Sequence, residues 1–97
     1  MARTSWDEMK AARAGDSAVE AAYAAAQLAF ELGEQVRGLR EERGWSQRDL
    51  AKLTGMTQPG IARFEAGGTT PTLPILERIA NAFDSTLSVQ LKPKAVA

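Results

Sequence analysis

A chain of 97 residues with 12 basic and 12 acidic side chains fits one small domain with a short extension. It contains neither cysteine nor histidine, which excludes disulfides and thiolate metal sites and removes the commonest metal ligand and general base. We therefore expect no enzyme, no metal and no cofactor, and, since no apolar run reaches membrane-spanning length, a soluble cytoplasmic protein.

The zero net charge hides a division along the chain. Residues 1–34 hold three basic and six acidic side chains, a net charge of −3, whereas residues 35–97 hold nine basic and six acidic ones, a net charge of +3. The C-terminal part suits an anionic polymer, and the N-terminal part suits a basic partner. Random partition of surface charge explains the same counts and stays open.

The first third of the chain predicts two helices. S-x-x-E capping boxes begin at Ser5 and Ser17, and Gly15 lies between the two segments. The second segment is rich in alanine up to residue 32, which favours a helix. One apolar stripe along it recurs at spacings of four, three and four residues and consists of Val19, Tyr23, Ala26 and Phe30. We expect Gly33 to kink or weaken the passage into a third helix, which Gly44 ends.

Three short helices are predicted to follow, joined by loops of a few residues. Ser46, Thr57 and Thr72 are placed as their N-caps, and Gly55 and Gly67 end the first two. The fold class we expect is therefore all-α, with the domain at residues 32–84 and an N-terminal helical extension at residues 1–31.

Residues 47–66 predict two helices joined by a tight turn. Leu50, Ile61 and Phe64 are the expected interior positions, and Ala51 falls where the helices cross. Gly55 occupies the turn, where a positive φ angle favours glycine. These positions together are typical of a helix-turn-helix.

The last segment changes its period. Leu87, Val89 and Leu91 alternate with polar residues, which predicts a half-buried strand within residues 85–97. A strand needs backbone partners, so we expect it to pair across a homodimer or to join a sheet of another protein. A loose extended tail is the remaining alternative.

The stretch "LREERGWSQRDLAKLTGMTQPGIARFEAGGTTPTLPILERIA" resembles the phage-repressor-like, Xre-type helix-turn-helix family. The likeness runs from about Leu32 to Phe83. The matching positions are Ser46, Gln47, Ala51, Gly55, Thr57, Gln58, Ile61, Glu65, Gly67 and Pro71. The resemblance implies a five-helix, repressor-like domain that binds double-stranded DNA as a homodimer on a palindromic operator.

By this resemblance, the helix that begins at Thr57 is the recognition helix in the major groove. Pro59 and Gly60 leave room for base edges and thymine methyl groups, and Gln58 suits N6 and N7 of adenine. Arg63 is expected to reach a guanine or a phosphate. Because Pro59 and Gly60 offer no polar side chain, specificity is expected to be modest or to depend on DNA shape.

Four further residues are expected at the phosphate backbone. The resemblance places Gln47 and Arg48 at a helix start that faces a phosphate, and Thr69 and Thr70 in the loop after the recognition helix. Alternatives stay open for five of these residues. Gln47 and Gln58 could be solvated first-turn residues, Arg63 an ordinary exposed arginine, and Thr69 and Thr70 only turn residues.

Arg40 and Glu65 match a family pair that ties the first helix of the domain to the recognition helix. We interpret them as a structural ion pair rather than a binding site. Leaving either one alone in a partly buried place is expected to destabilise the domain.

The extension carries Trp6, Met9, Tyr23 and Phe30, which form either extra core or a docking face. The layout of the whole chain resembles HigA-type antitoxins of type II toxin–antitoxin modules. That resemblance implies binding to a small basic RelE/HigB-like ribonuclease toxin and repression of the protein's own operon. The alternative is a stand-alone Xre-family transcriptional regulator whose extension serves only dimerisation.

Overall fold

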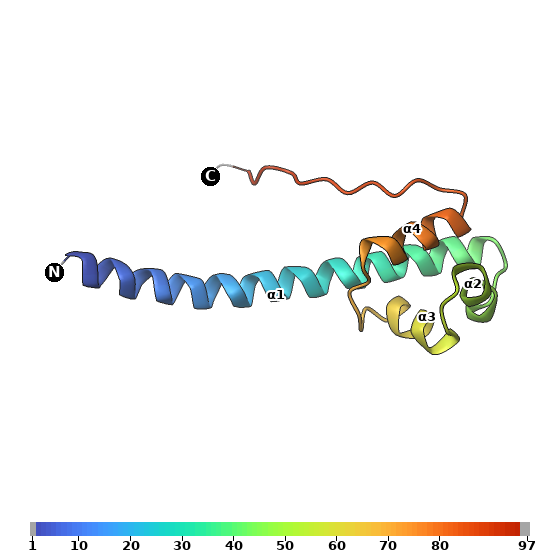
Figure 1. Cartoon of the computed structure of the whole chain (residues 1–97), viewed down its shortest axis with the longest axis horizontal. Helices are drawn as coiled ribbons and strands as arrows, with labels where there is room; N and C mark the ends of the chain where they lie inside the picture. Colours follow the sequence, from blue (N-terminus) through green and yellow to red (C-terminus); the bar gives the residue numbers. More distant parts are fainter. Residues whose placement is uncertain (1, 96–97) are drawn as a thin grey trace.

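The computed structural model describes residues 2–95, with side chains from residue 17 onward. This part of the chain forms four α-helices, α1 (Ala2–Glu42), α2 (Gln47–Thr54), α3 (Gln58–Glu65) and α4 (Leu73–Ala82). Figure 1 shows α1 crossing the whole length of the molecule, with the other three helices gathered around its C-terminal half. The prediction of a helical fold is confirmed. None of the helices described is long and apolar enough to span a membrane.

Helix α1 is continuous over 41 residues. The prediction that Gly15 ends one helix is wrong, and Ser17 lies inside the helix rather than at a cap. Gly33, expected to kink or weaken the passage into a third helix, lies within the same continuous helix. A glycine in a helix costs up to about 1 kcal/mol relative to alanine. The alanine-rich segments on both sides of Gly15 offset that cost, so the helix propagates through it.

Gly33 has a packing role instead. A Cβ atom there would clash with the carbonyl oxygen of Phe64 and lie 2.8 Å from that of Glu65. A Cβ atom at Gly67, whose φ is +78°, would lie 2.9 Å from the Cα atom of Phe30. Helix α1 and the end of α3 therefore meet backbone to backbone, which only glycine permits at these two positions.

The core lies where α1, α2, α3 and α4 meet. Its buried apolar residues are Val36, Leu50, Ala51, Ile61, Phe64, Ile79 and Phe83. The predicted interior positions are confirmed, since Leu50 and Ile61 are fully buried and Phe64 is 1% exposed. Gly55 adopts a φ of 72° in the turn between α2 and α3, as expected.

Local hydrogen bonds fix the start of α2. The Ser46 hydroxyl accepts the N–H of Asp49 and the Asp49 carboxylate accepts the N–H of Ser46, which is a reciprocal capping box. Thr72 precedes α4 as predicted, but its side chain makes no capping hydrogen bond. Pro74, in the first turn of that helix, removes an N–H that has no intrahelical partner.

The segment after α4 differs from the prediction. The chain turns at Asp84, whose φ is 54°, and continues without a fifth helix or a strand as far as residue 95. Leu87 is half-buried, whereas Val89 and Leu91 are 66% and 98% exposed. The predicted strand is wrong for the chain described because no second strand is present to pair with it. Figure 1 shows this tail returning toward the N-terminal end of α1.

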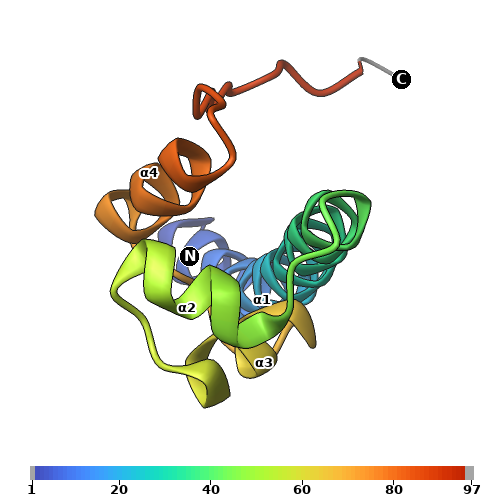
Figure 2. The same cartoon turned by 90° about the vertical axis from the view of Figure 1, so that its right-hand side faces the viewer.

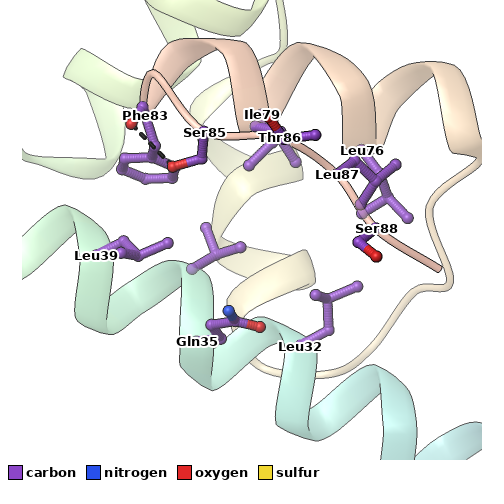
Figure 3. A pocket seen from close by; sticks show the side chains of 12 residues that line it. Leu32, Gln35, Leu39, Leu76, Ile79, Phe83, Ser85, Thr86, Leu87 and Ser88 are labelled. Carbon is purple, nitrogen blue, oxygen red and sulfur yellow. Dashed lines mark hydrogen bonds between the residues drawn. The ribbon is translucent and has the colours of Figure 1, made fainter. Parts of the chain in front are cut away.

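The start of the tail lines a groove between α1 and α4. Residues 85–88 face Leu32 and Leu39 of α1 and Leu76 and Ile79 of α4 around a largely apolar hollow of about 280 Å³ (Figure 3). Leu87 is the tail residue that is half-buried there. The tail is thus held near α4 by apolar contacts and diverges beyond Ser88.

Candidate nucleic-acid interface

The N-terminal ends of α2 and α3 lie together. Gln47 is the first residue of α2 and Gln58 the first of α3, and the Gln58 Nε2 donates to the Gln47 Oε1 at 2.7 Å. Both side chains are half-buried. Figure 2 shows α2 and α3 adjoining each other, with the start of α3 directed away from α1. Two helix N-termini therefore meet in one accessible tip.

The hydrogen bond between the glutamines restricts the Gln58 amide. Of its two N–H groups, one is taken by Gln47, which leaves one N–H and the Oε1 free. One donor beside one acceptor is the pair that matches N7 and N6 of adenine. The hydrogen bond to Gln47 thus holds the Gln58 amide in place and leaves one donor and one acceptor without a partner among the described residues.

The tip is tied to α1 through Glu65. The Gln47 Nε2 donates to Glu65 at 3.2 Å, and Arg40 donates to the two carboxylate oxygens of Glu65 at 2.7 and 2.9 Å. Arg40 also donates to the carbonyl oxygen of Trp45 at 2.8 Å. The side chains of Arg40 and Glu65 are only 11% and 4% exposed. A continuous line of hydrogen bonds therefore runs from α1 to Gln58.

Arg40 and Glu65 are the charged groups in this line of hydrogen bonds, and both keep their charge at neutral pH. Burial tends to raise the pKa of Glu65, but the hydrogen bonds from Arg40 and Gln47 and the positive charge of Arg40 together hold that pKa below its ordinary value. The same hydrogen bond raises the pKa of Arg40. Both groups are therefore ionised at neutral pH, where Gln47 donates to a carboxylate.

The first turn of α3 is slim. The Gly60 N–H donates to the Thr57 hydroxyl at 3.1 Å, which caps the helix. Thr57 and Pro59 are exposed and Gly60 is partly exposed. A Cβ atom at Gly60 would lie 3.1 Å from the Thr57 Oγ1, so glycine also relieves crowding in this turn. The tip thus exposes backbone and small groups around Gln58.

The other predicted DNA contacts lie in two places. Arg63 is exposed near the C-terminal end of α3, where its carbonyl oxygen accepts the N–H of Gly68 at 2.9 Å. Thr69 and Thr70 follow in the next loop and are exposed. Arg48 is exposed beside Gln47. The structure therefore divides the predicted set into a group at the tip and a group at the far end of α3.

The larger side chains of the extension that the structure describes do not join the core. Tyr23 is 77% exposed and Phe30 is 51% exposed. The side chains of Trp6 and Met9 lie outside the described residues. Val19 and Leu28 are likewise 69% and 65% exposed, and every residue from 17 to 28 is exposed.

Three functional features escaped the sequence analysis. The bond between Gln47 and Gln58 depends on the approach of two helices and has no local signal. The Ser46–Asp49 box has an S-x-x-D spacing that could have been found. Gly33 could also have been noticed, since glycine inside an alanine-rich helix favours a close backbone approach.

A family model described as helix-turn-helix matches residues 36–90. The competence pilus inhibition repressor of Acinetobacter baylyi is 34% identical over 59 residues, which cover 61% of this chain and 54% of that protein. The HTH-type transcriptional regulator SutR of Escherichia coli is 32% identical over 66 residues, which cover 68% of this chain and 37% of that protein. The chain thus spans about half or less of the length of these relatives.

Solved structures of other proteins share the helical fold of this chain. The restriction-modification controller protein C.AhdI of Aeromonas hydrophila superposes with a TM-score of 0.58 at 29% identity, covering 60% of this chain and 88% of that one. A chain of the HipA–HipB–O2–O3 complex superposes with a TM-score of 0.57 at 25% identity, covering 67% of this chain and 92% of that one. SutR is named as a transcriptional regulator and C.AhdI as a controller protein, and this chain shares their helix-turn-helix fold.

Proposed function

Because the chain belongs to the helix-turn-helix family, we propose that it is a sequence-specific DNA-binding regulator that inserts the start of α3 into the major groove. The observation that carries this proposal is the Gln47–Gln58 pair at two joined, accessible helix N-termini. The relatives named as a repressor and a transcriptional regulator support it.

Base reading falls to Gln58. Its free N–H and Oε1 suit one adenine, and Thr57, Pro59 and Gly60 allow the helix start to approach base edges and thymine methyl groups closely. Since these three neighbours offer little direct hydrogen bonding to bases, DNA shape and deformability are expected to supply part of the specificity.

Phosphate contacts frame the base reading. At the tip, Arg48 and the free N–H groups at the start of α2 suit one phosphate. At the far end of α3, Arg63 and the hydroxyl groups of Thr69 and Thr70 suit a second. Two copies on a palindromic operator would act as a repressor of the protein's own operon.

Two alanine variants test this proposal on the DNA upstream of the protein's own gene. Gln58→Ala is expected to weaken operator binding by about 1–3 kcal/mol and leave binding to scrambled DNA unchanged, because a base contact carries sequence information. Arg48→Ala is the matched control, which is expected to weaken both DNAs alike and to lower the salt dependence by about one phosphate contact. Failure of the unaltered protein to bind at low salt, or an equal effect of Gln58→Ala on both DNAs, would contradict the proposal.

A second candidate function is that of a HigA-type antitoxin, in which the extension also binds a basic RelE/HigB-like ribonuclease toxin. The exposed Tyr23 and Phe30 favour a protein ligand, as does the net charge of −3 over residues 1–34. This chain is also similar to a chain of the HipA–HipB–O2–O3 complex, in which two different proteins occur together, and that likeness supports a protein partner.

Co-expression with the neighbouring gene tests this second candidate. An antitoxin is expected to co-purify with a small basic protein and to suppress its ribonuclease activity. A neighbouring gene that encodes no ribonuclease-like protein, or a product that passes through without binding, would leave the stand-alone regulator.

A further inference from the structure

We propose that α1 pairs with α1 of a second copy through Val19, Tyr23, Ala26 and Phe30, antiparallel about a two-fold axis between residues 24 and 25. We call these four residues the α1 stripe. The pairing of the helices is argued from α1 itself, and the choice of occupant rests also on the proposed DNA binding.

The α1 stripe has the form of a coiled-coil seam. Its spacings of four, three and four residues keep the side chains on one face of the helix. Val19 and Tyr23 are 69% and 77% exposed, and Phe30, whose backbone is in contact with Gly67, still exposes 51% of its surface, so most of the stripe is uncovered in the chain described. In the same repeat the next positions are Asp16, which is charged, and Gly33, which is buried under α3. The seam is therefore short and has its centre between residues 24 and 25.

This stripe is complementary to itself. In the antiparallel register, Tyr23 lies opposite the small Ala26 of the second copy, and Phe30 lies opposite Val19 of the second copy. Large side chains thus face smaller ones in all four layers. Beside the seam, Glu20 is next to Gln27 of the second copy, so no like charges meet among the described side chains of the seam.

The register sets the distance between the two DNA-binding tips. The C-terminal end of α3 lies beside α1 between Gly33, which meets the backbone of Phe64 and Glu65, and Arg40, which bonds the Glu65 side chain. Gln47 bonds both Glu65 and Gln58, so the tip lies close to this contact. The middle of this contact is about 12 residues from the two-fold axis, so at about 1.5 Å per residue the two α3 helices lie about 36 Å apart along α1. Half-sites on one face of B-DNA are about 34–36 Å apart. A second copy therefore fits this stripe better than an unrelated protein does.

The two tips also face the same side. Helices α2, α3 and α4 together form the DNA-binding body. The face of α1 that is buried under this body carries Ala29, Gly33 and Val36, and it is about 80° around the helix from the α1 stripe. The start of α3 points away from α1 (Figure 2). A two-fold axis perpendicular to the paired helices keeps both tips on one side, where a single duplex can meet them.

Sedimentation equilibrium of the full chain without DNA tests the interface. Tyr23→Glu is expected to raise the dimer dissociation constant about 100-fold or more, because two aromatic side chains leave the seam. Leu28→Glu is the matched control, since Leu28 is 65% exposed on the opposite face of the same helix, and it is expected to leave the dimer intact. An unaltered protein that is monomeric at micromolar concentration, or a dimer that Tyr23→Glu does not weaken, would overturn the proposal.

Cysteine cross-linking tests the register, because the chain has no native cysteine. A mixture of Tyr23→Cys and Ala26→Cys chains is expected to form a disulfide-linked heterodimer under oxidation, whereas each variant alone is expected to cross-link at least about tenfold less. Efficient self-cross-linking of Tyr23→Cys would indicate parallel helices and overturn the register. Both experiments omit DNA, so their failure is separate from a failure of DNA binding, which the Gln58→Ala assay reports.

Discussion

Glu65 joins stability to recognition at a single residue. It accepts hydrogen bonds from Arg40 of α1 and from Gln47 of α2, and Gln47 in turn accepts from Gln58. The carboxylate is buried, so its charge is tolerated only while Arg40 compensates it. The orientation of the base-reading amide therefore depends on an ion pair that is itself shielded from solvent.

Glu65→Gln is expected to lower the free energy of unfolding by about 3 kcal/mol at pH 7, because Arg40 would remain buried without its counter-charge. The folded-state pKa of Glu65 lies below its ordinary value of 4.5, so the stabilisation is fully present above that pH and is lost as the pH falls through the folded-state pKa. The two proteins are expected to become more alike in stability below pH 4.5. Urea denaturation at pH 7 and at lower pH measures both effects.

Glu41→Gln provides the control for that prediction. Glu41 pairs with Arg37 at 2.9 Å, but the two side chains are 55% and 63% exposed. Solvent screens such a pair, and the expected loss is less than about 0.5 kcal/mol. A Glu65→Gln loss no larger than this would show that the buried pair does not support the fold.

Helices α2 and α3 follow from local signals, whereas α1 does not. Capping predicts Ser46 and Thr57, turn geometry predicts Gly55, and periodicity predicts the buried Ile61. Each of these signals lies within a few residues, and the structure places all four residues accordingly. The same local rules predict breaks in α1. At Gly33 the local rules fail because the close contact with the end of α3 requires glycine, and this contact cannot be read from neighbouring residues.

The candidate site was only partly predictable for the same reason. Gln47 and Gln58 could be selected because their motif fixes each of them at a helix start. Their mutual hydrogen bond and the link to Glu65 depend on how three helices meet, so only the three-dimensional structure reveals them. The tail failed differently, since an alternating pattern predicts a strand but cannot supply the neighbour that a strand needs.

Gly33→Ala tests the close approach of α1 and α3. The added methyl group would meet the carbonyl oxygens of Phe64 and Glu65, and overpacking of this kind costs about 1–3 kcal/mol. We also expect weaker operator binding, because the end of the recognition helix must shift. Thermal unfolding and a DNA titration measure the two effects.

Gly38→Ala is the matched control in the same helix. A Cβ atom at Gly38 has no neighbour within 4 Å, so only the helix propensity changes. This variant is expected to stabilise the protein by about 0.5–1 kcal/mol and to leave DNA binding unchanged. Equal behaviour of the two variants would remove the packing role assigned to Gly33.

The whole molecule is an elongated shape of 63 × 27 × 20 Å, with the DNA-binding body at one end of α1. The proposed pairing of two such molecules predicts the operator. Hydroxyl-radical footprinting is expected to show two protected patches on one face of the duplex, about one helical turn apart. Insertion of 5 base pairs at the centre would move one half-site to the opposite face and is expected to abolish cooperative binding. Patches two turns apart would contradict the register of the α1 stripe.

Replacing one atom of the DNA tests directly whether Gln58 reads a base. Operators in which single adenines become 7-deaza-adenine lack the N7 acceptor that the free N–H of Gln58 would use. One such position in each half-site is expected to weaken binding of the unaltered protein by about 1–3 kcal/mol and to have no effect on Gln58→Ala. If every 7-deaza substitution affects both proteins equally, Gln58 does not read an adenine at N7 and the claim fails.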